Sequence, residues 1–229
     1  MKKEYTFDKV MEILRSLAKP EDLEGMARFG IRGDKRLGLS VPQLRKLGKS
    51  IGKDHEMALK LWDTGIQDAM ILAALVDDPL KVTEEQAEDW VRDIDSWDVC
   101  DQLCMNLFDK VPFAEKKIGE WSKRDEEFVK RVAYAMIACI AWHDKKASDQ
   151  ELIRFLPVIR DGATDGRNYV KKAVSWALRH IGKRNLNLNR EAVKLAEEIG
   201  KMDSKASRWV ASDVIRELES DAVQNRLRK

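Results

Sequence analysis

Apolar residues recur at intervals of three and four along almost the whole chain, and the strict alternation typical of strands is essentially absent. The first two examples are Phe7, Val10, Met11, Leu14 and Leu17, and then Val41, Leu44, Leu47 and Ile51. This spacing places the apolar side chains on one face of a helix and predicts amphipathic helices. Pro42 stands at the expected start of the second helix. Further segments of the same kind are residues 54–64, 66–77, 84–94, 97–109, 126–141, 167–182, 188–200 and 206–220.

Two of these segments align with each other without gaps. EEFVKRVAYAMIACIAW begins at Glu126 and RNYVKKAVSWALRHIGK begins at Arg167, an offset of 41 residues. GIQDAMILAALVDD and ASRWVASDVIRELES resemble an earlier and a later copy. A period of about 40 to 47 residues is typical of HEAT and armadillo repeats, whose helix pairs stack into a solenoid. We therefore expect an all-α fold of HEAT-like helical repeats in a curved solenoid, with a plain helical bundle as the alternative.

Composition agrees with a folded helical protein. The 229 residues are 36% charged and include only 12 Gly and 5 Pro, which argues against a disordered or collagen-like chain. The length suffices for one large domain or two small ones, and we expect a single all-helical domain over residues 1–229. No apolar run reaches the roughly 18 to 20 residues of a membrane span, and MKKEYTFDKV has no apolar signal region. We expect a cytoplasmic protein that binds no membrane.

Motifs of the commonest enzyme classes are absent. The chain has no GxGxxG, GxxxxGK[ST], GxSxG or HExxH, and its three histidines do not form a cluster with ligand spacing. Cys100 and Cys104 are four residues apart and do not form a CxxC pair, so buried reduced thiols are the simplest interpretation. We expect neither a metal nor a cofactor.

The net charge of +2 conceals an asymmetry along the chain. Residues 1–120 hold 19 Lys and Arg against 24 Asp and Glu, whereas residues 121–229 hold 23 against 16. Between Arg154 and Arg190 nine cations face only Asp161 and Asp165. Clustered cations are typical of a nucleic-acid surface, although a solvated helix face is the competing explanation. The sequence predicts DNA contacts by Lys130, Arg131, Lys171, Lys172, Arg179, Lys183 and Arg184.

Tryptophan is the commonest aromatic residue, with seven in the chain. Four of them occupy apolar helical positions and are predicted core residues: Trp62, Trp90, Trp121 and Trp142. Trp97 instead opens a helix after Ser96, and Asp101 follows one turn later on the same face. Trp176 lies among cations in VKKAVSWALRHIG.

Trp97, Asp101, Arg131 and Trp176 fall on three consecutive helical units, and stacked units would bring them to one groove. Indole faces attract cations, a guanidinium binds phosphate, and a carboxylate stabilises positive charge that develops beside it. The set suits a cationic aromatic ligand on a phosphate backbone. An ordinary core Trp with an acid near a helix start is the alternative for Trp97 and Asp101, although Asp98 lies closer to that helix start.

At these residues the chain resembles the AlkD-type DNA alkylation repair proteins, which are HEAT-like-repeat DNA glycosylases. The resemblance covers about residues 7–221 and rests on four motifs: LGLSVPQLRKL, WDVCD, VKR ending at Arg131, and KKAVSWALR. It implies that Asp101 is the catalytic carboxylate, that Trp97 and Trp176 contact the lesion nucleoside, and that Arg131 contacts the DNA backbone. An aromatic residue near the N-terminus also contributes in this family, and Phe29 is the nearest candidate.

The resemblance further implies hydrolysis of the N-glycosidic bond of N3- or N7-alkylated purines in double-stranded DNA. Such purines are already cationic and leave without protonation, while Asp101 stabilises the oxocarbenium-like sugar and orients water. Two alternatives stay open at this point: a noncatalytic binder of distorted or branched DNA, and a protein-binding scaffold. We expect a monomer.

Overall fold

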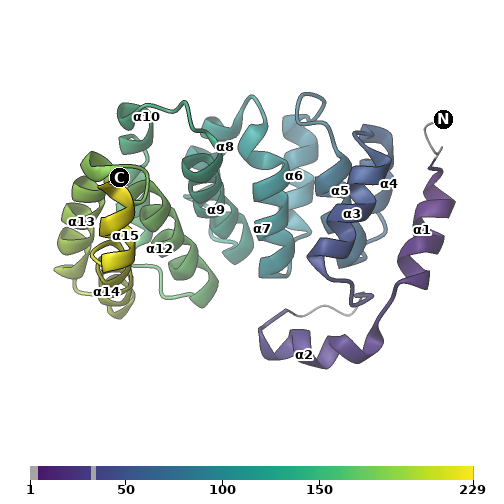
Figure 1. Cartoon of the computed structure of the whole chain (residues 1–229), viewed down its shortest axis with the longest axis horizontal. Coiled ribbons are helices and arrows are strands. Elements are labelled where there is room, and N and C mark those ends of the chain that lie inside the picture. The colour runs from purple at the N-terminus through teal and green to yellow at the C-terminus, as the bar shows by residue number, and fades with distance from the viewer. Residues whose placement is uncertain (1–4, 32–34, 229) are drawn as a thin grey trace. The chain divides into compact units, whose positions relative to one another are not determined.

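The computed structural model describes residues 5–31 and 35–228, in which every regular element is a helix (Figure 1). The predicted all-α class is therefore confirmed. The chain divides into two compact units, Met1–Phe113 and Ala114–Lys229, which we describe separately. The prediction that residues 1–229 form one continuous domain stays a prediction.

Unit 1 is built around helix α5. Its elements are α1 (Phe7–Ser16), the 3-10 helix η1 (Pro20–Asp22), α2 (Leu23–Arg28), α3 (Val41–Ile51), α4 (His55–Trp62), α5 (Gln67–Val76), α6 (Glu84–Arg92), α7 (Trp97–Asn106) and the 3-10 helix η2 (Phe108–Lys110). Helices α3, α4 and α7 all pack against α5, which buries every residue except Leu75. This explains why residues 69–76 are apolar on all sides rather than along one stripe.

The segment between α2 and α3 is fixed to α5 and α7 by two buried carboxylates. Asp68 accepts hydrogen bonds from the backbone N–H groups of Leu37 at 2.7 Å and Leu39 at 2.8 Å. Asp98 accepts two more from the guanidinium of Arg36. Gly38 has φ +84°, and a Cβ at that position would collide with the Lys19 carbonyl oxygen. The LGLS part of the LGLSVPQLRKL motif therefore docks an irregular segment onto the helices that follow.

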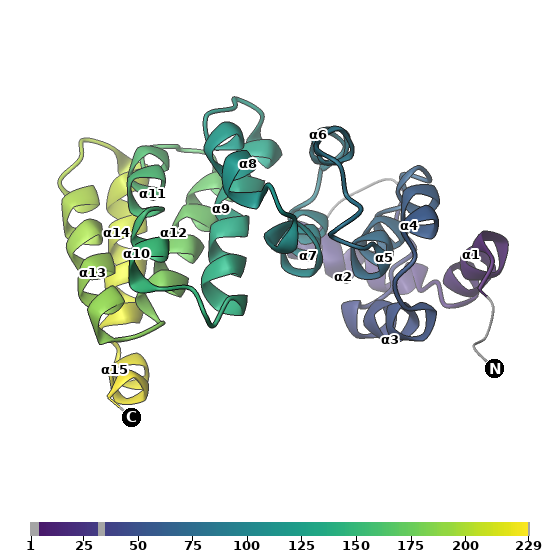
Figure 2. The same cartoon turned by 90° about the horizontal axis from the view of Figure 1, so that it is seen from above.

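Unit 2 contains four long helices, of which α9, α12 and α14 lie side by side. Its elements are α8 (Ala114–Trp121), α9 (Glu127–His143), α10 (Asp149–Ile153), α11 (Leu156–Gly162), α12 (Asn168–Gly182), α13 (Leu186–Gly200), α14 (Lys205–Leu218) and α15 (Asp221–Leu227). Helix α12 packs against both α9 and α14, while α8 packs on α9 and α13 packs on α12 and α14 (Figure 2). Each long helix thus has a partner on either side, as in a stack of repeats.

The 41-residue offset predicted for the repeat is present in unit 2. Helices α9 and α12 begin at Glu127 and Asn168, and the residues before them adopt nearly the same backbone conformation, with φ −67° and ψ 126° at Glu126 and φ −67° and ψ 133° at Arg167. Equivalent sequence positions therefore start equivalent helices. The next repeat is shorter, because α14 begins at Lys205, 37 residues after the start of α12 at Asn168.

The predicted core is correct for three of the four tryptophans assigned to it. Trp62, Trp90 and Trp121 are buried, and the first two stack with their ring centroids 4.1 Å apart. Trp142 is 44% exposed, so its assignment to the core was wrong. The apolar packing of α9 ends at the buried Ala141, and Trp142 lies in the last turn of that helix.

The cysteines are buried, as expected for Cys100 and Cys104. Within residues 5–31 and 35–228, no helix combines the length and the apolar character needed to cross a membrane.

Candidate nucleic-acid and catalytic site

Trp97 and Asp101 lie on helix α7 of unit 1, as their spacing predicts. Trp97 is the first residue of the helix, and both side chains are half-buried. The Trp97 indole Nε1 donates a hydrogen bond to the Phe29 carbonyl oxygen at 3.2 Å. Phe29 itself is 78% exposed at the end of α2. The structure therefore brings the N-terminal aromatic candidate next to the first predicted wall of the site.

The carboxylate nearest the start of α7 has a structural role. Asp98 is 8% exposed and is held by Arg36, while Ser96 donates its hydroxyl proton to the same carboxylate. Ser96 occupies the N-cap position as expected, but its side chain does not cap the helix backbone. Asp98 is thus engaged inside the protein, and Asp101 is the half-buried acid on the same helix.

Arg131 and Trp176 lie on adjacent helices of unit 2. Arg131 is 5% exposed on α9, and its Nη1 donates to the Tyr169 carbonyl oxygen at 2.7 Å, which ties α9 to the first turn of α12. Trp176 is half-buried on α12, with its ring edge-on to the ring of His180 at 5.8 Å. The predicted contact of Arg131 with a DNA phosphate stays a prediction.

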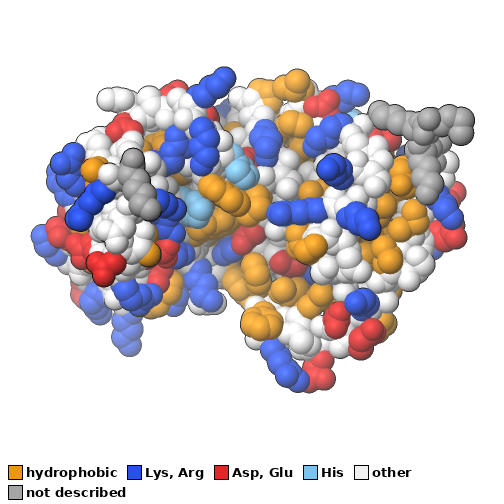
Figure 3. Space-filling view, viewed as in Figure 1, with side chains coloured by type: hydrophobic (Ala, Val, Ile, Leu, Met, Phe, Trp, Pro, Cys, Tyr) orange, Lys and Arg blue, Asp and Glu red, His pale blue; other side chains and the backbone are white. Residues whose placement is uncertain are grey.

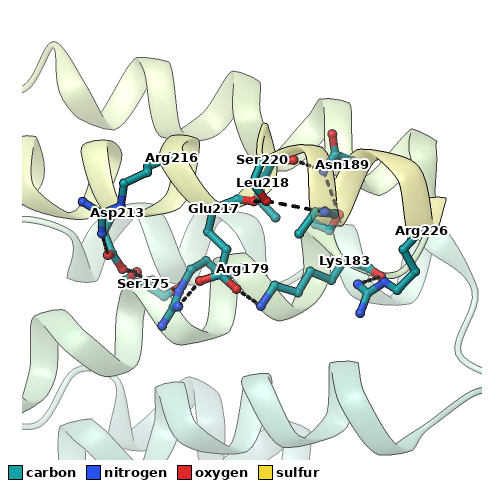
Figure 4. A network of polar contacts seen from close by, with 12 residues as sticks. Ser175, Arg179, Lys183, Asn189, Asp213, Arg216, Glu217, Leu218, Ser220 and Arg226 are labelled. Atoms are coloured by element: carbon teal, nitrogen blue, oxygen red, sulfur yellow. Dashed lines mark hydrogen bonds and ion pairs between the residues drawn. The ribbon is translucent and has the colours of Figure 1, made fainter. Parts of the chain in front are cut away.

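Three of the predicted DNA-binding cations are held by ion pairs on the surface of unit 2. Arg179 and Lys183 on α12 both pair with Glu217 of α14 (Figure 4). Lys130 lies 3.6 Å from the Asp165 carboxylate. Burial, with help from the nearby Arg179 and Arg226 charges, lowers the pKa of Lys183. Glu217 therefore neutralises part of the basic stretch that the sequence displays.

Arg184, Lys171 and Lys172 differ in whether the protein itself already engages their charge. Arg184 donates to the carbonyl oxygen of Ala141 at 2.8 Å and to that of Asp144, so it holds the turn after α9. Lys171 lies over the Trp209 ring, 5.1 Å from its centroid. Lys172 is exposed and makes no ion pair with another described residue. Within this predicted set, Lys172 is the clearest candidate for a phosphate contact.

A cluster that the sequence reasoning missed lies at the ends of α9 and α12. Trp142 stacks on His143 with their centroids 4.8 Å apart, and its ring centroid lies 6.0 Å from that of His180. Burial and the charges of surrounding cations lower the pKa of His180 to about 4. The available signal was the sequence WHDKK, in which Trp142 is followed only by polar residues and thus ends the apolar pattern.

The sequence profile described as DNA alkylation repair enzyme matches residues 10–218. The chain belongs to this family. Membership confirms the resemblance expected from the WDVCD and KKAVSWALR motifs, because the match covers all the predicted site residues. This DNA alkylation repair family member keeps Trp97, Asp101, Arg131 and Trp176 on three helices, α7, α9 and α12.

Two sequence relatives and one solved structure are similar to this DNA alkylation repair family member. Two uncharacterized proteins, from Listeria monocytogenes and Listeria innocua, are each 32% identical over 88 residues, which is 37% of this chain and 39% of each relative. The chain thus matches about two fifths of the length of these curated relatives. A solved structure from a family related to the HEAT-like repeat DNA glycosylases, with affinity for branched DNA structures, is 20% identical. The structural alignment covers 93% of this chain and 95% of the solved chain, with a TM-score of 0.74. This match confirms the HEAT-like helical-repeat class.

Proposed function

We propose that this protein is a DNA glycosylase that removes cationic N3- or N7-alkylated purines from double-stranded DNA. The observation that carries the proposal is the pair formed by Trp97 and Asp101 on α7, in a chain whose family is described as DNA alkylation repair enzymes. Asp98 on the same helix is bonded to Arg36 and has a structural role. We assign the chemistry to Asp101 because it lies on the same face of α7 as Trp97.

The reaction needs no general acid, because an alkylated purine already carries the positive charge that makes it leave. As the bond between base and sugar breaks, positive charge moves onto the deoxyribose. The Asp101 carboxylate stabilises that charge and orients the water that attacks the anomeric carbon. The Trp97 indole contacts the cationic nucleoside through its electron-rich face, and the family resemblance assigns the same kind of contact to the Trp176 indole. Arg131 and the exposed Lys172 hold the backbone phosphates.

The test is release of N7-methylguanine or N3-methyladenine from methylated duplex DNA. Asp101→Asn removes the charge with little change in shape, and we expect it to lose most of the release while DNA affinity is kept. Asp89→Asn on α6 is the matched control, because Asp89 is exposed and pairs with Arg92 of its own helix, and this variant should release base normally. Absence of release by the wild-type protein would overturn the proposal.

The second candidate function is noncatalytic binding of branched or distorted DNA. The affinity for branched DNA attributed to the 20% identical solved relative favours it. Its signature is DNA binding that weakens with salt, together with a negative result in the release assay. A protein without salt-dependent DNA affinity would exclude both candidates.

A further inference from the structure

The end of helix α9 presents an aromatic surface outside the predicted catalytic set. Trp142 is 44% exposed although it is one of the largest apolar side chains in unit 2. His143 covers one side of its indole with the rings 28° from parallel, and the His180 ring meets it edge-on. Figure 3 shows hydrophobic and histidine side chains beside lysines and arginines over α9. An exposed indole supported in this way is a platform on which another flat ring can stack.

The turn that follows Trp142 is held rigidly. Arg184 of the α12–α13 connection donates to the carbonyl oxygens of Ala141 and Asp144, on either side of Trp142 and His143. The Asp144 carboxylate accepts hydrogen bonds from the backbone N–H groups of Lys146 at 2.9 Å and Ala147 at 3.1 Å. The backbone that carries Lys145 and Lys146 is therefore fixed next to the indole before any ligand arrives.

The two lysines of this turn outnumber its one carboxylate, that of Asp144. Lys145 and Lys146 are exposed, and neither makes an ion pair with another residue in the part of the chain that the structure describes. By contrast, Arg179 and Lys183 share Glu217. The Lys145 charge is close enough to His180 to help lower the pKa of that imidazole. A flat apolar surface beside exposed lysines matches a ligand that joins an aromatic ring to an anion.

We propose that Trp142, Lys145 and Lys146 bind an unpaired nucleotide of DNA, with the base stacked on the indole and its phosphates beside the lysines. Stacking on an aromatic side chain next to cations is how proteins hold single-stranded DNA, and paired bases cannot use such a site because they are covered by their neighbours. The proposal rests on the DNA binding proposed above. It adds a site for unpaired DNA next to the predicted nucleoside contact Trp176, whose ring reaches the Trp142 cluster through His180.

The experiment compares three forms of one DNA: a blunt duplex, the same duplex with a short single-stranded thymine arm, and the duplex with an arm of abasic sites. The abasic arm keeps the phosphates and lacks the bases, so it separates stacking from charge. We expect the full-length protein to bind the thymine arm at least about fivefold more tightly than the abasic arm, which is the gain from one stacked base. Equal affinity for the two arms overturns the inference even if the blunt duplex binds.

Variants then locate the preference. Trp142→Ala should abolish the difference between the two arms and leave affinity for the blunt duplex unchanged, whereas Trp142→Phe should keep part of it. Trp209→Ala is the matched control, because Trp209 is 37% exposed on α14 of the same unit and should leave the preference intact. A preference that survives in Trp142→Ala overturns the inference. If the wild-type protein binds none of the three DNAs, the proposed function fails together with this site. If it binds the blunt duplex but shows no preference for the thymine arm, only the site for unpaired DNA fails.

Discussion

Two parallel hydrogen bonds join Arg36 to Asp98, with Nη1 to Oδ2 at 2.8 Å and Nη2 to Oδ1 at 3.0 Å. The residues are 62 positions apart, and only 3% of the Arg36 side chain and 11% of the Asp98 side chain are exposed. This buried pair fixes the segment before α3 to the first turn of α7, the helix that carries Trp97 and Asp101. The position of the catalytic candidates therefore depends on a buried ion pair between distant parts of unit 1.

Arg36→Met should destabilise unit 1 strongly. The variant leaves the Asp98 carboxylate buried without its cation, which costs about 3–5 kcal/mol in the free energy of unfolding. Arg92→Met is the matched control, because the Arg92 side chain is 56% exposed and its pairs with Glu88 and Asp89 contribute at most about 1 kcal/mol. Urea unfolding measures both values. Similar losses in the two variants would contradict a structural role for the buried pair.

Lys172→Gln should weaken DNA binding through the phosphate backbone. Lys172 has no ion pair with another described residue, so its replacement should lower the slope of log affinity against log salt by about 0.9. Lys183→Gln is the comparison, because Lys183 already pairs with Glu217 and its loss should change the slope less. Binding titrations on one duplex over a range of salt concentrations give both slopes. A larger change for Lys183 would show that its pair with Glu217 opens when DNA binds.

His180 should make the protein less stable in mild acid. Its pKa falls from the ordinary 6.5 to about 4, first because of burial and then because of the charges of Lys183, Arg179, Lys145 and Arg226. The folded state then binds the proton less tightly than the unfolded state. The resulting stability is present above pH 6.5 and is lost as the pH falls towards 4.

His180 alone should make the free energy of unfolding about 2 kcal/mol lower at pH 5 than at pH 7.5. His180→Phe cannot take up the proton, so its unfolding free energy should fall less over the same interval. Urea unfolding of the two proteins at the two pH values measures the difference. Parallel curves for wild type and variant would show that the imidazole titrates normally in the folded protein.

Much of the fold could be predicted because helical periodicity is a local property. The pattern over residues 66–77 and 167–182 predicts α5 and α12 to within a residue or two, and the aligned segments predict the 41-residue repeat of α9 and α12. The spacing of Trp97 and Asp101 likewise determines that they share one face of α7, since residues four apart in a helix lie one turn apart.

Tertiary structure decided which charged and aromatic side chains are available to a partner. Arg179 and Lys183 look like free cations in the sequence, and only the packing of α14 beside α12 gives them Glu217, 38 residues after Arg179. Trp142 looks like a core residue, and only the folded chain shows that it lies beyond the packed part of α9. Helix formation depends on neighbours within a turn, whereas ion pairing and exposure depend on residues brought together from other repeats. The sequence by itself thus determined the helices and the family of this protein, and the folded structure decided which of its cations and aromatic rings are exposed to a partner.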